Sequence, residues 1–350
     1  MATARGRKPP IPLTVVAGAR GAGKTTLINR LLADPAFANT AVILNDFGAT
    51  ELSGGIVSSS ASDGYIALGS GCVCCSVRGA LTDALETLLR DLDNGRVARI
   101  QRLVIEADEA ADAAAIVLAV ERHPYLSLRY QIDGIIAVVD GRTAEAILAA
   151  RADTVQQVAV ADVVAFTCGA SDIVAAINPL ALIVDASAAP VSSFIGHGAF
   201  DASTDNLDAW LTLRRATSVM LTGEAARIRT FAVERARSMP LDALDRFLDH
   251  LAALVGPKLI RMRGAASGED GATIIVEAIG GAFRPPAIVD APAGAGPRIR
   301  FVVVGRDLEP AMFEGYLAAF LNEALTDTPD RAAIVANPLA IAGFSARRGR

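Results

Sequence analysis

The sequence predicts an α/β fold with a mostly parallel β-sheet flanked by helices, followed by a smaller α+β domain. Between residue 13 and about residue 186, apolar β-branched runs alternate with helical stretches, which is typical of a parallel sheet covered on both faces. Further along, the strand patterns cluster with helices at their sides, as in α+β domains. A length of 350 residues also favours two domains.

The first domain is expected to span residues 11–186. Its strand patterns are short and nearly continuous in apolar residues, and its helical patterns are longer and amphipathic. Such sheets place ligands at the carboxyl ends of their strands, so functional residues are expected there. The predicted strands are 11–17, 41–44, 103–106, 134–140, 162–167 and 180–185, and the predicted helices are 26–32, 80–91, 110–122 and 143–151.

The second domain is expected to span residues 217–326. Residues 1–10 are predicted to be a disordered lead-in, the small and polar residues 187–216 a linker, and residues 327–350 a flexible tail. The elements of the second domain follow from the same strand and helix periodicities. The predicted strands are 218–221, 259–263, 273–279 and 300–304, and the predicted helices are 240–254 and 310–325.

Composition excludes several classes of protein. The chain is 52% hydrophobic and 20% charged with a mean hydropathy of +0.39, which argues against global disorder. A net charge of −5 gives no signal for direct nucleic-acid binding. No apolar run approaches the ~20 residues of a membrane helix, so a cytoplasmic protein is expected. Its four cysteines then favour metal ligands or redox thiols over disulfides. Frequent Ala and Arg with scarce Lys favour a GC-rich bacterial genome.

Residues 18–25 (GARGAGKT) fit the phosphate-binding pattern G-x-x-x-x-G-K-[ST] between a predicted strand and a predicted helix. In this pattern backbone N–H groups surround a phosphate, the lysine meets the β- and γ-phosphates, and the hydroxyl ligates magnesium. A glycine-rich turn that binds nothing is the alternative, and the strand–loop–helix context argues against it. The residues expected to bind nucleotide are Gly18, Gly21, Ala22, Gly23, Lys24, Thr25 and Thr26.

Residues 71–75 (GCVCC) form the second distinctive motif. Thiolates are soft ligands that favour zinc or copper(I), and this segment offers Cys72, Cys74 and Cys75 within one short stretch. The glycines at positions 69 and 71 allow the loop to curl so that the sulfur atoms can converge. The alternative is three small buried apolar residues, because free cysteine is often buried.

The two motifs together resemble those of the CobW-like branch of the CobW/HypB/UreG family of P-loop GTPases. Residues 45–48 (NDFG) are similar to the family's N-E-F-G, and residues 70–78 (SGCVCCSVR) to its N-G-C-x-C-C-S-x-R. Glu106 resembles the acidic end of its Walker B strand. The second half resembles the CobW C-terminal domain at residues 259–264 (LIRMRG) and 301–308 (FVVVGRDL).

The resemblance implies a P-loop NTPase fold and a zinc-binding metallochaperone or metal-homeostasis factor with an unidentified client protein. Zinc would be held by Cys72, Cys74 and Cys75. GTP would be the nucleotide, with ATP as an alternative. Magnesium would be held by Thr25 with an acidic residue, Glu106 or Asp46. Lys24, Thr25 and Glu106 would serve any hydrolysis. Asp46 has an alternative role as a simple turn residue.

The sequence departs from the family at two places. The family's Walker B strand ends in E-T-S-G, whereas residues 106–109 here are EADE, so Glu109 would face phosphate charge without compensation. The family's base-reading N-K-x-D or T-K-x-D is replaced by residues 167–170 (TCGA). These departures leave two alternatives: a degenerate interaction protein that recruits a partner such as a ribosome-associated factor, or an ATP-using kinase, which would not explain the cysteines.

Overall fold

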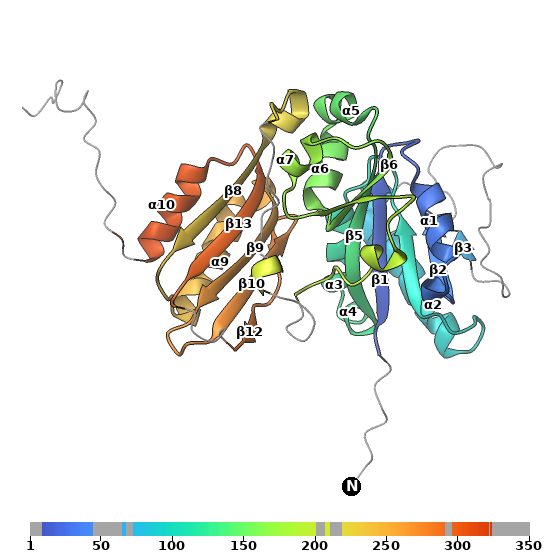
Figure 1. The fold of residues 1–350 in the computed structure, drawn as a ribbon. Helices are drawn as coiled ribbons and strands as arrows, with labels where there is room; N and C mark the ends of the chain where they lie inside the picture. The colour runs from blue at the N-terminus through green and yellow to red at the C-terminus, as the bar shows by residue number, and fades with distance from the viewer. Residues whose placement is uncertain are drawn as a thin grey trace, which may run out of the picture. The chain divides into compact units, whose positions relative to one another are not determined.

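The structure is a computed structural model that describes residues 9–44, 65–67, 73–200, 207–210, 219–290, 296–321 and 323. The chain divides into two compact units, Met1–Pro310 and Ala311–Arg350. The first unit contains a parallel and an antiparallel β-sheet, which Figure 1 shows in ribbon form. The α/β fold with a further antiparallel sheet confirms the fold class that the sequence predicts.

The parallel sheet has seven strands in the order β3-β2-β4-β1-β5-β6-β7. All of its neighbouring strands run parallel. Five of the six predicted strands lie within a residue or two of their expected bounds, and β5 begins four residues earlier. The strands are β1 (Ile11–Gly18), β2 (Thr40–Leu44), β3 (Tyr65–Ala67), β4 (Arg102–Glu106), β5 (Tyr130–Asp140), β6 (Val163–Cys168) and β7 (Leu182–Asp185).

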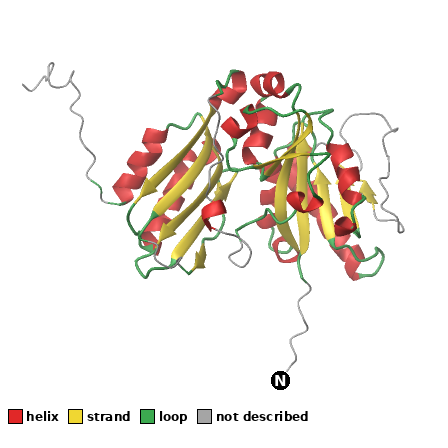
Figure 2. Cartoon of the chain, in the orientation of Figure 1, coloured by secondary structure: helices red, strands yellow, loops and turns green. Residues whose placement is uncertain are grey.

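Helices lie on both faces of this sheet (Figures 1 and 2). Because side chains alternate along a strand, Leu13, Val15 and Ala17 of β1 join one buried cluster while Val16 joins another. The helical elements are α1 (Lys24–Leu32), η1 (Pro35–Phe37), α2 (Val73–Asp93), α3 (Ala113–Glu121), α4 (Leu126–Arg129), α5 (Ala144–Ala150), α6 (Ala152–Val160), α7 (Ile173–Ile177), η2 (Val191–Phe194) and α8 (Leu207–Trp210).

The antiparallel sheet has the strand order β11-β10-β9-β13-β8, and β12 also pairs with β10. Helix α9 packs against it, because the rings of Phe247 and Phe301 stack with centroids 5.9 Å apart. The elements are η3 (Gly223–Arg227), β8 (Ile228–Arg235), α9 (Leu241–Val255), η4 (Gly256–Lys258), β9 (Leu259–Ser267), β10 (Thr273–Ile279), β11 (Ala282–Phe283), β12 (Ala287–Val289) and β13 (Ile299–Arg306).

The strand predicted at residues 218–221 is wrong: described residues 219–221 form no strand, and Met220 is 86% exposed. The edge strand is β8 instead, which pairs with β13 along its whole length. Its sequence mixes buried Ile228 and Val233 with exposed charged residues. A half-polar edge strand such as β8 lacks the continuous apolar pattern that predicts a strand. The short apolar run at residues 218–221 has that pattern although its described residues form no strand.

The second unit contains most of α10 (Pro310–Phe320). The helix predicted at residues 310–325 therefore begins where expected but ends at Phe320. Among the described helices, none combines the length and the apolarity that crossing a membrane requires. The domain boundaries at residues 10, 186, 216 and 326 stay predictions.

Candidate nucleotide and metal site

The loop between β1 and α1 depends on three glycines with left-handed backbone angles. Gly18, Gly21 and Gly23 have φ values of 148°, 78° and 99°. A Cβ atom on Gly18 would lie 2.4 Å from the Val138 carbonyl oxygen, and one on Gly23 would lie 2.7 Å from Cγ2 of Thr167. Other residues are therefore excluded at these two positions by both strain and space. The loop has the concave, glycine-dependent backbone that can surround a phosphate.

Lys24 and Thr25 open helix α1, whose N-terminus favours anions. The Nζ of Lys24 donates hydrogen bonds to the carbonyl oxygens of Gly18 at 2.8 Å and Ala19 at 3.2 Å. The Oγ1 of Thr25 donates to Oε1 of Glu106 at 3.0 Å. Two oxygen ligands of this kind, a hydroxyl and a carboxylate, suit a hard cation such as magnesium.

The pairing of Thr25 with Glu106 follows from strand register. Glu106 is the last residue of β4 and pairs with Val16 of β1, two residues before the phosphate loop begins. The carboxyl ends of β1 and β4 therefore meet at one edge of the sheet, as expected for a ligand site of this fold class. This edge brings together Lys24, Thr25 and Glu106, which the sequence analysis selected for the nucleotide and magnesium.

The charge of Lys24 is set by competing effects. Burial lowers the pKa of the Lys24 ammonium below its ordinary value, and nearby Arg20 lowers it further. The carboxylates of Glu106, Asp108 and Glu109 act in the opposite direction but do not cancel the effect of burial. The lysine is thus a partly desolvated cation, for which a phosphate would be a strong partner.

Thr167 supports the phosphate loop, a role that no pattern in the sequence indicates. Its Oγ1 donates to the carbonyl oxygen of Ala22 at 2.8 Å, so the end of β6 holds the middle of the loop. Asp172, two residues after the altered base-reading segment in the sequence, is exposed where α7 begins. Thr167 and Ala22 are separated by 145 positions, and nothing in a single sequence indicates that they are in contact.

The segment after β4 is held in place by Gln157 of helix α6. This side chain is buried, and its Nε2 donates to the carbonyl oxygens of Glu109 at 3.1 Å and Ala111 at 2.9 Å. Asp108 also closes a turn, because its Oδ1 accepts from the backbone N–H of Ala110 at 3.0 Å. The backbone that carries Glu109 is therefore fixed by tertiary hydrogen bonds.

The expectation that Glu109 has no compensating partner is wrong. Oε2 of Glu109 lies 3.5 Å from Nη1 of Arg151, and the same oxygen accepts a hydrogen bond from the backbone N–H of Arg20 at 3.2 Å. Arg20 belongs to the phosphate loop. The structure thus places a carboxylate directly on the loop that the sequence predicts to hold phosphate, with a cation beside it.

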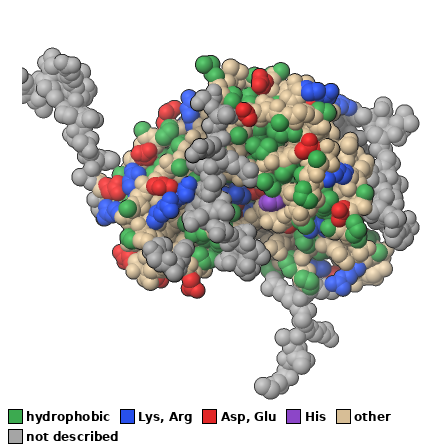
Figure 3. Space-filling model, in the orientation of Figure 1, with side chains coloured by type: hydrophobic (Ala, Val, Ile, Leu, Met, Phe, Trp, Pro, Cys, Tyr) green, Lys and Arg blue, Asp and Glu red, His purple; other side chains and the backbone are tan. Residues whose placement is uncertain are grey.

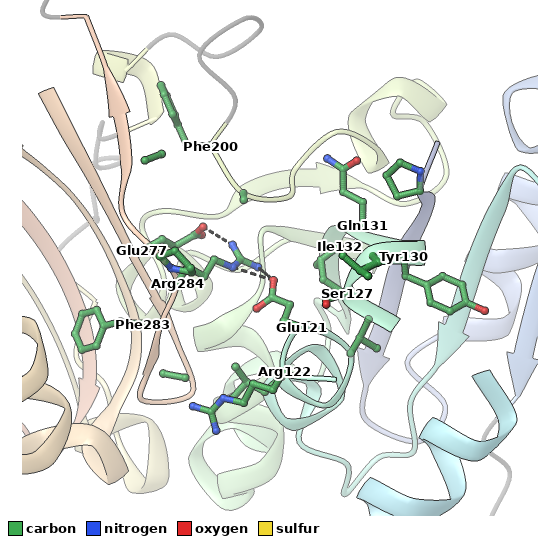
Figure 4. Close-up of a pocket in the computed structure, with 18 of the residues that line it drawn as sticks. Glu121, Arg122, Ser127, Tyr130, Gln131, Ile132, Phe200, Glu277, Phe283 and Arg284 are labelled. Atoms are coloured by element: carbon green, nitrogen blue, oxygen red, sulfur yellow. Dashed lines mark hydrogen bonds and ion pairs between the residues drawn. The ribbon is translucent and has the colours of Figure 1, made fainter. Parts of the chain in front are cut away.

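Two cavities differ in their relation to this site. A cavity of about 240 Å³ borders the phosphate loop at residues 19–22 and is closed on its other side by β5 and α5. A larger cavity of about 710 Å³ lies elsewhere and is mostly apolar (Figure 4). Three of its charged residues are paired with one another, because Arg284 contacts both Glu121 and Glu277. None of the residues selected from the sequence lines the larger cavity.

The metal ligands selected from the sequence are only partly covered by the structure. Cys72 and Asp46 lie outside the described residues. Cys74 and Cys75 lie in the first turn of helix α2, and their side chains are outside the described part. Within the part of the chain that is described, no group of three or more His, Cys, Asp or Glu residues is placed to hold a metal ion.

Backbone register nevertheless relates the cysteine motif to the phosphate loop. Ala67, which ends β3, pairs with Leu44 of β2, and Leu44 pairs with Glu106 of β4. Cys72 follows Ala67 by five positions in the sequence. Strand β3 therefore ends at the same edge of the sheet as β2 and β4, and Ala67 lies three strand spacings, roughly 14 Å, from β1.

Comparison with known protein families identifies both halves of the chain. Residues 12–168 match the family model described as "CobW/HypB/UreG, nucleotide-binding domain". Residues 228–321 match that of the "Cobalamin synthesis protein cobW C-terminal domain". Together these two matches cover most of the chain.

Curated relatives are similar over a shorter region. The chain is 40% identical over 131 residues to the zinc chaperone YjiA of Escherichia coli K12, which is 37% of this chain and 41% of the relative. It is 32% identical over 137 residues to zinc-regulated GTPase metalloprotein activator 1 of Saccharomyces cerevisiae, covering 38% and 31%. It is 32% identical over 145 residues to the zinc chaperone CobW of Sinorhizobium sp., covering 40% and 39%. The matched region spans less than half of each relative.

A solved structure supports the fold over a longer region. The Zn(II)-bound YjiA GTPase from E. coli aligns with 89% of this chain and 99% of its own, at a TM-score of 0.66 and 22% sequence identity. At this level of identity the likeness shows the fold.

Proposed function

The chain belongs to the CobW/HypB/UreG family, and we propose from this that it is a nucleotide-dependent zinc metallochaperone that prefers GTP. The observation that carries the proposal is the contact of Thr25 with Glu106, 3.0 Å long, beside the glycine loop. This arrangement fits an anion site and a hard-cation site at one sheet edge. The choice of metal and base is motivated by relatives named as zinc chaperones and as a zinc-regulated GTPase metalloprotein activator.

The nucleotide would be held through its phosphates. Backbone N–H groups of residues 18–25 would surround the phosphate oxygens, and Lys24 would turn from the Gly18 and Ala19 carbonyls toward the β- and γ-phosphates. Thr25 and Glu106 would hold magnesium, directly or through water. The magnesium would neutralise charge between the β- and γ-phosphates.

Zinc would be held by Cys72, Cys74 and Cys75 as thiolates. Cys74 and Cys75 begin helix α2, and the N-terminus of a helix favours negative charge. Three thiolates leave a fourth position for another ligand or for water, which permits transfer of the metal to a client protein. The cysteine motif and the phosphate loop follow strands of the same sheet edge, so nucleotide occupancy and zinc affinity would be linked.

Titration of GTP and ATP against zinc-loaded and zinc-free protein tests this proposal. We expect about one zinc per chain, tighter binding of GTP than of ATP, and a nucleotide affinity that differs between the two zinc states. Cys74→Ser with Cys75→Ser should remove the zinc in elemental analysis. Cys168→Ser, which changes a cysteine at the end of β6, is the matched control and should keep it.

Lys24→Ala provides the baseline for the nucleotide. It should abolish binding of both nucleotides, and hydrolysis above this baseline would make the protein a GTPase. Zinc content that is unchanged in the double cysteine variant would contradict the metal site. Partner capture that needs neither nucleotide nor zinc would favour the alternative of a recruiting protein.

A further inference from the structure

We propose that Glu109 is a specificity-determining residue that disfavours nucleoside triphosphates relative to diphosphates by competing with the terminal phosphate. The inference rests on the proposed nucleotide function and deepens it. Its starting point is the hydrogen bond from the Arg20 backbone N–H to Oε2 of Glu109, 3.2 Å long. A carboxylate oxygen there makes the contact that a phosphate oxygen makes in a loop of this kind.

The position of Glu109 corresponds to the terminal phosphate. Magnesium that accompanies the terminal phosphates would be held by the loop hydroxyl and the Walker B acid, which here would be Thr25 and Glu106. Glu109 follows Glu106 by three residues. Its contact is with the Arg20 N–H, four residues before α1 begins. A β-phosphate bound at the N-terminus of α1 would therefore leave Glu109 on the side of the terminal phosphate.

Glu109 is placed there by the fold. Buried Gln157 holds its backbone carbonyl, and the Asp108 turn fixes the residues beside it. Arg151 provides the neighbouring cation, although its shorter contact is with Asp153 at 2.6 Å rather than with Glu109 at 3.5 Å. The Glu109 side chain is thus aimed at the loop by a fixed backbone.

The contact is weak enough to be exchanged. Glu109 and Arg151 are 30% and 36% exposed, and ion pairs this exposed to solvent contribute little to stability. A triphosphate can displace the carboxylate from the Arg20 N–H, but its terminal phosphate then lies near an added negative charge. A diphosphate leaves the Glu109 contact in place. Glu109 should therefore shift the preference between the two nucleotides without closing the site.

The experiment compares affinities for GDP and for a non-hydrolysable GTP analogue in the full-length protein by calorimetry. Glu109→Gln keeps the size and an acceptor for the Arg20 N–H but removes the charge, and Glu109→Ala also removes the acceptor. We expect the ratio of analogue to GDP affinity to rise about tenfold in Glu109→Gln and at least as much in Glu109→Ala. Thermal unfolding checks that both variants are folded.

Asp108→Asn is the matched control. It removes one negative charge that also acts on Lys24, and asparagine keeps the Oδ1 acceptor that closes the turn to Ala110. Asp108 makes no hydrogen bond to the phosphate loop in the described contacts. The affinity ratio in this variant should equal that of the wild type. An unchanged ratio in Glu109→Gln, or an equal rise in Asp108→Asn, overturns the role of Glu109 and leaves the nucleotide function standing. Binding of neither nucleotide above the Lys24→Ala baseline, in any variant, overturns both.

Discussion

The candidate cation site consists of one residue at the start of a helix and one at the end of a strand. Thr25 lies in the first turn of α1 and Glu106 ends β4, and they meet although 81 positions separate them. The phosphate-loop pattern predicts the role of Thr25 from the sequence alone. Glu106 could be selected because it follows a buried apolar run, but only the register of β4 with β1 brings its carboxylate to Thr25.

Replacing Glu106 by glutamine tests this site at the level of one residue. The loss of the charged oxygen should reduce the gain in nucleotide affinity that magnesium provides by about tenfold, measured by titration with and without magnesium. Asp140→Asn is the control, because Asp140 ends the neighbouring strand β5 but pairs with Arg142 at 2.7 Å. An equal magnesium effect in wild type and Glu106→Gln would contradict the assignment.

At the level of elements, the junction between β1 and α1 is specified by local sequence. The glycine spacing permits three left-handed residues, and the preceding apolar run and following helix fix the two ends of the loop. The lateral support of the loop is not local. Thr167 from β6 and Gln157 from α6 hold the two segments that flank the site, and neither stands out in the sequence.

Alanine substitutions separate the two reasons for glycine in this loop. Gly21→Ala adds only backbone strain, since its Cβ would meet nothing within 4 Å, and should cost about 1 kcal/mol of unfolding free energy. Gly18→Ala also drives a Cβ into the Val138 carbonyl and should cost about 3 kcal/mol or more. Urea unfolding at equilibrium measures both. Equal losses would show that space around Gly18 is not limiting.

At the level of the whole molecule, the two sheets of the first unit are joined by buried charges. Arg261 donates to Asp162 at 2.5 Å and to Glu277 at 2.8 Å, and Arg263 donates to Asp162 at 2.7 Å. Asp162 directly precedes β6, whereas the two arginines lie in β9. Buried ion pairs contribute little net stability when complete but cost much when broken.

Acidic and basic side chains are also interspersed at the surface (Figure 3). Three arginines in or next to β13 are paired with carboxylates: Arg298 and Arg300 contact Glu234, and Arg306 contacts Glu224. The positive charge of β13 is therefore balanced by neighbouring elements rather than presented as a patch.

Glu277→Gln tests the buried charges. Burial raises the pKa of the Glu277 carboxyl, but Arg261, Arg284 and Arg263 outweigh it and hold the pKa below its ordinary value of 4.5. A lowered pKa stabilises the fold above pH 4.5, and this contribution is lost as the pH falls through the folded-state pKa. The variant should be about 3 kcal/mol less stable at pH 7, with the difference narrowing below pH 4.5.

Glu234→Gln is the comparison for this measurement. Glu234 also pairs with arginines, but its side chain is 48% exposed, so its loss should cost at most about 1 kcal/mol. Thermal or urea unfolding between pH 3 and pH 7 gives both values. A loss of stability in Glu277→Gln that does not change with pH would contradict the role of its charge.

The sequence by itself determined the features that depend on neighbouring residues. These are the phosphate loop, the alternation of strands and helices, and the Cys72, Cys74 and Cys75 motif, because periodicity and short spacing are local properties. The edge strand β8 escaped prediction because polar edge strands resemble loops. Its place is set by pairing with β13.

Only the tertiary structure decided which distant groups meet at the site. It placed Glu106 at Thr25, Thr167 under the loop, and Glu109 on the Arg20 N–H with Arg151 beside it. Each pair is separated by more than 40 positions, and strand order and helix packing bring its members together. A sequence specifies such contacts only through the free energy of the complete fold, so no local pattern of residues reveals them.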